Sequence, residues 1–215
     1  MSVIDAEQAD VLLEAAQQTG YRYPPSFRGF CASLLVSGAE LASHTVNVAV
    51  GKGGVAITSP DGVDSWATDQ VRSMVAHRLG RTYEEGDGRH AKRVVEDDHL
   101  LGPLVQLDDG MSSSYRVADG QIALVTRQPG PKRFSIAVQS RIETEDGSYL
   151  PAEFAVFFWG LDGSLEASEA YSDTYVKVDS LFLPEKRRVI RADGDGVSAR
   201  LLTLTDHILT TEVGS

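Results

Sequence analysis

The stretch Ser114–Arg127, SYRVADGQIALVTR, decides the fold. Two runs of alternating apolar and polar residues flank the dipeptide Asp119-Gly120. Asp-Gly readily adopts the positive φ angles of a two-residue hairpin turn, and alternation with a period of two is typical of a strand with one buried face. The stretch is therefore predicted to form an antiparallel β-hairpin.

The turn also predicts the strand register. With a two-residue loop, Val117 pairs with Ile122 and Tyr115 pairs with Leu124, which puts all four on the apolar face. The serines at 112–114 precede this face in the sequence MSSSY, which lacks the G-x-S-x-G elbow that presents a nucleophilic serine. We interpret these serines as part of an ordinary polar strand.

The same kind of turn recurs along the C-terminal half. Asp146-Gly147, Asp162-Gly163 and Asp195-Gly196 each separate two strand-like runs. They predict a meander of antiparallel strands, and no helix longer than about two turns is expected after Arg81.

Two helices are predicted in the N-terminal half. One begins at Asp5 and stops at Gly20, and the other spans DSWATDQVRSMVAHRLG, from Asp64 to Gly80. Between them, YRYPPSF (21–27) contains two prolines and is predicted to be an extended connector, docked by its aromatic side chains. The predicted fold class is α+β, with a large curved antiparallel sheet, a half-barrel or open barrel. An N-terminal helix accompanies it, and the second helix covers the concave side.

The composition is that of an ordinary globular protein. The 215 residues are 42% hydrophobic and 24% charged, which fits a single domain spanning 1–215. The net charge of −11 disfavours nucleic acid and anionic membranes as partners, and the most basic run, PEKRRVIR (184–191), is interpreted as a solvated strand face. The N-terminus does not resemble a secretory signal, and no apolar segment approaches twenty residues, so a cytoplasmic protein without a membrane partner is expected. The oligomeric state stays open, with a dimer among the options.

Metal binding is not predicted. Cys31 is the single cysteine, and the nearest histidines, His77, His90 and His99, lack the i, i+4 spacing of a helical metal site. A three-histidine site is chemically feasible among interleaved acidic residues, so their convergence is left open. The expectation is that the protein holds neither metal nor cofactor.

Arg78 is out of pattern in the second predicted helix, because it falls near the centre of an apolar stripe that includes Met74. Its stem could cover apolar surface while its head reaches water or the helix carbonyls. Alternatively, its guanidinium points into the concavity of the sheet and holds a carboxylate or phosphate. His77 lies at the edge of the stripe, where it either titrates near neutrality or is a half-exposed helical histidine.

A second set of polar residues lies in the C-terminal half. Tyr171, Asp173 and Tyr175 share one face of a predicted strand. A carboxylate on an inward face needs a partner, and Arg78 and Arg127 are the candidates.

Several of these segments resemble a known family. GYRYPPSFRGFCASLLV, AHRLGRTYEE, SSYRVADGQIALVTRQ, FSIAVQSRIETEDGSYLPAEF and SDTYVKVDSLFLPEKRRVI occur in the order found in a family of proteins of about two hundred residues, described as a domain of unknown function and known from phototrophs and other bacteria. The family pattern matches this chain at His77-Arg78, Tyr115, Arg127, 149–151, and Asp173 with Tyr175. Members commonly carry further histidines after the position of Arg127, which RQPGPKRF lacks. The architecture resembles lipoprotein-carrier and lipocalin-like half-barrels, which implies an apolar ligand.

Two functions are weighed against a purely structural or assembly role. The first is a protein that binds an amphipathic or anionic small molecule in the cavity of the curved sheet. Its predicted ligand-binding residues are Trp66, Met74, Arg78, Arg127, Phe158, Asp173 and Tyr175, with Phe154 and Val156 in the wall. The alternative is a cytoplasmic enzyme that performs acid–base chemistry on a small molecule in the same cavity, with His77, Arg78 and Tyr115 as candidate catalytic residues.

Overall fold

The computed structural model describes residues 3–4, 6–38, 42–51, 54–60, 62–95 and 97–210. The elements in chain order are β1 (Val3–Ile4), α1 (Ala6–Gln18), β2 (Gly29–Ser37), β3 (Ala42–Gly51), β4 (Gly54–Thr58), α2 (Ser65–Ala76), the short 3-10 helix η1 (Asp87–Arg89), β5 (Lys92–Val95), β6 (Leu104–Leu107), β7 (Ser114–Ala118), β8 (Gln121–Arg127), β9 (Arg133–Glu143), β10 (Tyr149–Trp159), β11 (Leu165–Val178), β12 (Leu181–Asp193) and β13 (Gly196–Leu209).

The strands form an open sheet. In the described residues its order is β1-β5-β6-β7-β8-β9-β10-β11-β12-β13-β2-β3-β4, so β1 and β4 are its edges and the sheet does not close into a barrel. Neighbouring strands pair antiparallel, as in β9 with β10 and β2 with β3. After Arg81, the described part of the chain contains no helix beyond the three residues of η1. The α+β class and the antiparallel meander are confirmed.

Contacts between Cα atoms divide the chain into two compact units. Unit 1 contains 1–21, 81–171 and 191–197, and unit 2 contains 22–80, 172–190 and 198–215. The long strands β11, β12 and β13 contribute residues to both units. The expectation of a single domain spanning 1–215 stays a prediction.

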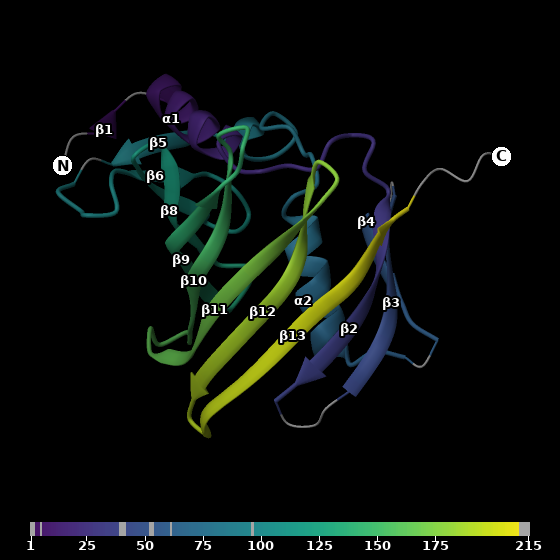
Figure 1. The fold of residues 1–215 in the computed structure, drawn as a ribbon. Coiled ribbons are helices and arrows are strands. Elements are labelled where there is room, and N and C mark those ends of the chain that lie inside the picture. Colours follow the sequence, from purple (N-terminus) through teal and green to yellow (C-terminus); the bar gives the residue numbers. More distant parts are fainter. Residues whose placement is uncertain are drawn as a thin grey trace. The chain divides into compact units, whose positions relative to one another are not determined.

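In unit 1, α1 packs against the sheet. It contacts β5, β7 and β8, and Figure 1 shows it next to β5. Apolar side chains from the helix and the strands form one buried cluster, because the buried positions of α1 recur at helical spacing on one face. The cluster consists of Ala9, Leu13, Val94, Val105, Leu107 and Tyr115.

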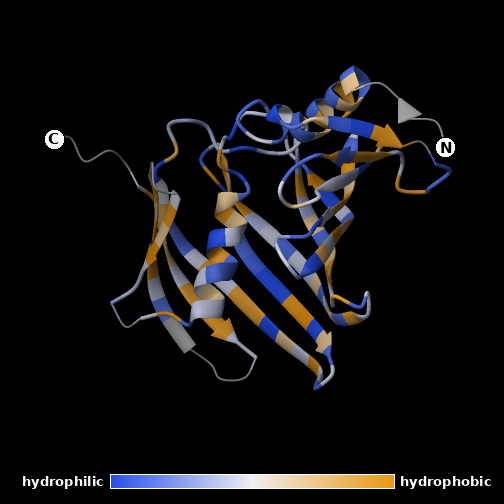
Figure 2. Cartoon of the chain, turned by 180° about the vertical axis from the view of Figure 1, so that it is seen from behind, coloured by the Kyte–Doolittle hydropathy of each residue, from blue (hydrophilic) through white to orange (hydrophobic). Residues whose placement is uncertain are grey.

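In unit 2, α2 covers one face of the strands, which curve around it (Figures 1 and 2). The helix begins after Asp64, whose carboxylate accepts a hydrogen bond from the backbone N–H of Trp66 at 2.7 Å, as an N-cap residue does. Its buried residues are Ala67, Val71, Met74 and Val75, which is the predicted apolar stripe. Alternating hydrophobic and hydrophilic residues along the strands, visible in Figure 2, supply the other side of this core. The helix predicted to cover the concave side is therefore confirmed.

The register of the hairpin at 114–127 differs in part from the predicted register. Asp119 and Gly120 have φ angles of 51° and 71°, and Val117 pairs with Ile122 as predicted. Tyr115, however, pairs with Val125 rather than Leu124, because a register shift lies between Arg116 and Val117.

This shift is the signature of a β-bulge, which adds one residue to one strand. Beyond the bulge, Tyr115 shares its face with Val125, and both pack in the cluster under α1. The pairing of Tyr115 with Leu124 was wrong because a bulge leaves no mark in an alternating pattern. The strand β6, with only the four residues LVQL, was also not predicted.

Candidate functional site

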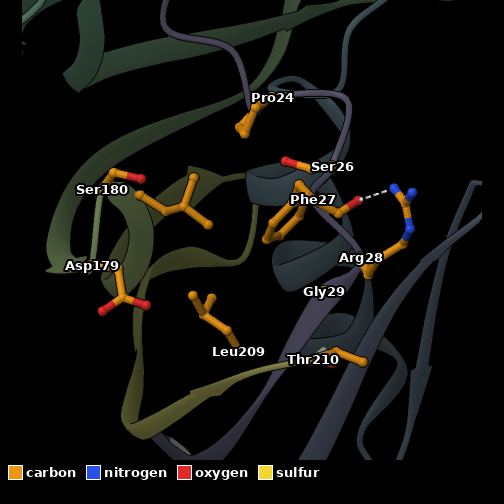
Figure 3. Close-up of a pocket in the computed structure, with 10 residues that line it drawn as sticks. Pro24, Ser26, Phe27, Arg28, Gly29, Asp179, Ser180, Leu209 and Thr210 are labelled. Atoms are coloured by element: carbon orange, nitrogen blue, oxygen red, sulfur yellow. Dashed lines mark hydrogen bonds between the residues drawn. The ribbon is translucent and has the colours of Figure 1, made fainter. Parts of the chain in front are cut away.

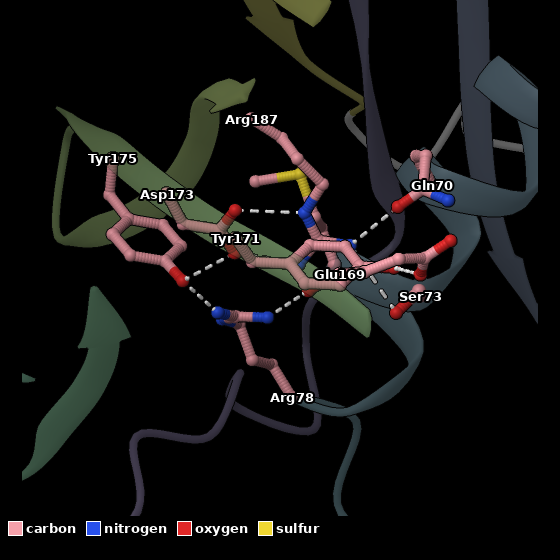
Figure 4. Close-up of polar contacts among 9 residues, drawn as sticks. Gln70, Ser73, Arg78, Glu169, Tyr171, Asp173, Tyr175 and Arg187 are labelled. Atoms are coloured by element: carbon pink, nitrogen blue, oxygen red, sulfur yellow. Dashed lines mark hydrogen bonds and ion pairs between the residues drawn. The ribbon is translucent and has the colours of Figure 1, made fainter. Parts of the chain in front are cut away.

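The most buried polar residues of unit 2 are an ion pair between Asp173 and Arg187. Their exposed fractions are 2% and 4%. The Arg187 Nε donates to Asp173 Oδ1 at 2.8 Å and its Nη2 donates to Oδ2 at 2.6 Å, which is the bidentate geometry of a strong guanidinium–carboxylate pair (Figure 4). The carboxylate that the sequence placed on an inward face is therefore neutralised by a neighbouring strand.

The partner of Asp173 corrects the sequence interpretation. Arg78 and Arg127 were the candidates, and the run containing Arg187 was interpreted as a solvated face. In β12, however, Leu183, Arg187 and Val189 are all buried and are separated by even numbers of residues, so Arg187 lies on the same inward face as its apolar neighbours. Only the pairing of β12 with β11 brings this arginine beside Asp173.

The same guanidinium connects the sheet to α2. Arg187 Nη1 donates to Gln70 Oε1 at 3.1 Å and to Ser73 Oγ at 3.5 Å. Figure 4 shows both side chains reaching from the helix toward Arg187. Asp173, Arg187, Gln70 and Ser73 thus hold α2 against the strands of unit 2.

Arg78 is buried at the end of α2, with 5% of its surface exposed. Its guanidinium donates to the Met74 carbonyl oxygen and to the Tyr175 hydroxyl, and it lies 4.7 Å from the centre of the Tyr175 ring. The Tyr175 hydroxyl in turn donates to Asp173 at 3.4 Å. Arg78 therefore joins the network through Tyr175, and it also satisfies a helix carbonyl.

The electrostatics of this network favour a protonated tyrosine. Burial raises the pKa of Tyr175 to about 12, against the opposing effect of the nearby Arg78 cation. The hydroxyl consequently remains a donor to Asp173 at neutral pH. In the described residues, the Arg78 Nε has no hydrogen-bond partner.

The other predicted residues of unit 2 are packing groups or surface groups. Met74 is buried in the core, and His77 is exposed at the C-cap of α2, where its carbonyl accepts a hydrogen bond from Arg22 at 2.7 Å. Trp66 is half-buried beneath the guanidinium of Arg200, which lies 3.9 Å from the ring centre.

Tyr115 and Arg127 belong to unit 1, where they meet a residue that the sequence interpretation missed. The Tyr115 hydroxyl donates to Asp87 Oδ2 at 2.6 Å and accepts from Arg127 Nη2 at 2.6 Å. Gln17 of α1 donates to the same Asp87 oxygen at 2.6 Å. Burial raises the pKa of Tyr115 above its usual range, so the hydroxyl stays protonated and cannot serve as a base at neutral pH.

Phe158 is likewise in unit 1, on β10. It pairs with Phe134 of β9, and the guanidinium of Arg191 lies 5.9 Å from its ring centre. Phe154 stacks on Tyr171, with ring centres 4.5 Å apart. The predicted wall residues of β10 thus pack against neighbouring strands within unit 1.

A cleft of about 510 Å³ lies in unit 2, and we call it the Phe27 cleft (Figure 3). Its lining comes from the connector before β2, the turn between β11 and β12, and the end of β13. The lining residues are Pro24, Ser26, Phe27, Arg28, Gly29, Asp179, Ser180, Leu181, Leu209 and Thr210. Pro24, Phe27, Leu181 and Leu209 give the cleft apolar surface, and the other side chains are polar or charged.

The proline-rich connector forms one wall of this cleft. The Phe27 N–H donates to the Pro24 carbonyl at 2.9 Å, which closes a tight turn, and the Phe27 ring stacks on Tyr23 at 4.1 Å between centres. The Tyr23 N–H donates to the Arg78 carbonyl at 2.8 Å, which ties the connector to the end of α2. Tyr21, Tyr23 and Phe27 are all buried, so the predicted docking of the connector is confirmed.

Backbone geometry sets the position of this wall. Gly29 has a φ of 123°, and a Cβ atom there would lie 2.1 Å from the carbonyl oxygen of Val48. Only glycine allows the chain to enter β2 so close to β3. On the opposite side of the cleft, Asp179 adopts a φ of 53° in the turn after β11, a conformation that aspartate tolerates better than most residues.

Comparison with protein families identifies the chain. The model of a family described as "Protein of unknown function (DUF3386)" matches residues 4–209. The chain belongs to this family. The resemblance that the sequence motifs indicated is therefore confirmed, and no curated protein matches the sequence.

Three solved structures are similar to this member of the DUF3386 family. A protein domain described as an outer membrane lipoprotein-sorting domain, from Vibrio parahaemolyticus, is 8% identical, with a TM-score of 0.40, and the match covers 98% of this chain and 96% of that one. A LolA superfamily protein from Nitrosomonas europaea is 11% identical, with a TM-score of 0.31 and coverage of 97% and 94%. A DUF1329 family protein from Desulfovibrio piger is 8% identical, with a TM-score of 0.30 and coverage of 97% and 95%.

The histidines do not assemble into a metal site in the part of the chain that the structure describes, where no three His, Cys, Asp or Glu side chains form a suitable group. His90 Nε2 accepts a hydrogen bond from the Nε of Arg89, and His99 Nδ1 accepts one from the backbone N–H of Leu101. Within the same residues, no helix combines the length and the apolar character needed to span a membrane.

None of the predicted ligand-binding residues lines the Phe27 cleft. The sequence did predict a docked aromatic connector, which was the one available signal for this region. It could not show that the turn after β11 and the end of β13, more than 150 residues away in the chain, would complete the cleft.

Proposed function

We propose that this protein binds an amphipathic small molecule in the Phe27 cleft. The observation that carries this proposal is the size and lining of the cleft. Its volume of about 510 Å³ falls within the roughly 300 to 1,000 Å³ typical of small-molecule sites. Phe27, Leu181 and Leu209 offer apolar surface, while hydroxyl and charged groups at the rim suit a polar end.

The buried network of unit 2 supports a structural role for the remaining predicted residues. Asp173 and Arg187 satisfy each other, and Arg187 also binds two side chains of α2. A ligand at this network would have to displace interactions that fix the helix on the sheet. A ligand in the Phe27 cleft would displace none of these interactions.

The enzymatic alternative has less support from the geometry. His77, its candidate base, is exposed and does not line the cleft. The Tyr115 hydroxyl is held between Asp87 and Arg127, and its raised pKa keeps it protonated. Binding without a chemical step is therefore the function that we propose.

Titration calorimetry with octan-1-ol, a neutral probe, tests the proposal. The wild type should bind, and Leu209→Gln should weaken binding about fivefold, because losing about 1 kcal/mol of apolar contact changes affinity by that factor. Leu161→Gln is the matched control, because Leu161 is exposed and does not line the cleft. Equal affinities of the two variants, or no binding by the wild type, would contradict the proposal.

A further inference from the structure

We propose that the ligand of the Phe27 cleft is an amphipathic amine, with a cationic nitrogen next to an apolar body. This inference rests on the proposed function and adds the charge of the ligand. It follows from the state of the two ionisable side chains that line the cleft, Arg28 and Asp179.

Arg28 is engaged in holding the connector. Its Nη1 donates to the Pro25 carbonyl at 2.7 Å and to the Phe27 carbonyl at 3.3 Å. Figure 3 shows its guanidinium beside the Phe27 backbone and on the other side of the Phe27 ring from Asp179 and Leu209. An anionic ligand would have to compete with these two carbonyl groups for the Nη1 donors of Arg28.

Asp179 differs from Arg28, because its charged group is not engaged by other described residues. Its side chain is exposed at the rim, and within the described residues its carboxylate takes part in no hydrogen bond or ion pair. A carboxylate with unused acceptor capacity beside an apolar surface complements an ammonium group attached to an apolar body. In the described residues, the ionisable group at the cleft that makes no hydrogen bond or ion pair is therefore the acidic one.

The rest of the cleft and of the molecule is compatible with a cation. Ser26, Ser180 and Thr210 contribute neutral hydroxyl groups, which can accept hydrogen bonds from an ammonium group. The formal net charge of −11 attracts cations at long range. Local chemistry and the overall field thus act in the same direction.

Three probes with the same eight-carbon chain test this inference on the full-length protein: octylamine, octan-1-ol and octanoate. Titration calorimetry at neutral pH should show octylamine binding about fivefold more tightly than octan-1-ol, the effect of an exposed ion pair of about 1 kcal/mol. Octanoate should bind more weakly than the alcohol. Equal affinities for all three would leave the cleft as a binding site and overturn the amine assignment, whereas no binding of any probe would overturn the proposed function itself.

A pair of variants separates Asp179 from the general negative charge. Asp179→Asn should remove the preference for octylamine over octan-1-ol, and asparagine tolerates the positive φ of this position. Asp119→Asn is the matched control, because Asp119 is also exposed with a φ of 51° but lies in a turn of unit 1. If both variants lowered the octylamine preference equally, the overall field would explain it and the assignment to Asp179 would be wrong.

Discussion

Asp173 carries a negative charge in the interior of unit 2, where an unpaired carboxylate would be costly. Arg187 compensates it with two hydrogen bonds from the adjacent strand, and Tyr175 adds a third, longer one. A buried pair of this kind contributes modestly relative to an apolar pair, but breaking it by removing one partner is strongly destabilising.

Arg187→Met should therefore lower the free energy of unfolding by about 3 to 5 kcal/mol, because it leaves the Asp173 carboxylate buried without its partner. Chemical denaturation measures this change. The double variant Arg187→Met with Asp173→Leu should recover much of the loss. The control is Arg191→Met, which removes a far more exposed arginine from β12 and should lower the free energy of unfolding by no more than about 1 kcal/mol. If the two single variants lowered it by similar amounts, burial would not be the cause of the Arg187 effect.

At the scale of the elements, each helix is held on its strands by apolar packing and by a charged contact. In unit 2 that contact is Arg187 with Gln70 and Ser73 of α2. In unit 1, Asp10 of α1 accepts hydrogen bonds from Lys92 of β5 and from the Tyr83 hydroxyl. The Lys92 side chain is 1% exposed, whereas Asp10 is 45% exposed, so water reaches this pair from one side.

The contact between α1 and β5 predicts an acid dependence. The hydrogen bond from Lys92 lowers the pKa of Asp10 below its usual value, although burial opposes the shift. Because the folded pKa is below the unfolded one, this stabilisation is complete above about pH 4 and is lost as pH falls through the folded pKa. Asp10→Asn should therefore flatten the decline of stability below about pH 4, as measured by urea denaturation across pH.

The Lys92→Met background provides the control for this prediction. Without the lysine, Asp10→Asn should have a smaller further effect on the acid dependence, because the largest contribution that lowers the Asp10 pKa is absent and only the hydrogen bond from Tyr83 remains. An undiminished effect in that background would place the cause elsewhere than in the pair.

At the scale of the whole molecule, the two compact units share the long strands β11, β12 and β13. Each unit has its own helix and its own buried apolar residues, as a domain does, but the chain passes between the units within continuous strands. These strands have 13 or 14 residues and pair with their neighbours in the sheet, so unfolding part of such a strand would leave backbone N–H and C=O groups without their partners.

Shared strands predict that the chain unfolds cooperatively as a single domain. The two tryptophans report on different units, Trp159 on unit 1 and Trp66 on unit 2. The variants Trp66→Phe and Trp159→Phe each keep one tryptophan, which reports on one unit. During urea denaturation of either variant, the midpoint from tryptophan fluorescence should equal the midpoint from far-ultraviolet circular dichroism, which reports on the whole chain. A fluorescence midpoint that differs from the circular dichroism midpoint of the same variant would contradict a single cooperative domain.

The sequence by itself determined the class of fold, the two helices, the antiparallel meander and the docked aromatic connector. Each of these follows from local patterns: the spacing of apolar residues, Asp-Gly turns and prolines act within a few residues along the chain. Only the tertiary structure decided that Asp173 pairs with Arg187, that a bulge moves Tyr115 opposite Val125, and that Phe27, Leu181 and Leu209 line one cleft. These depend on which strands become neighbours and in what register, and that choice is made by burial over the whole sheet, which no local pattern records.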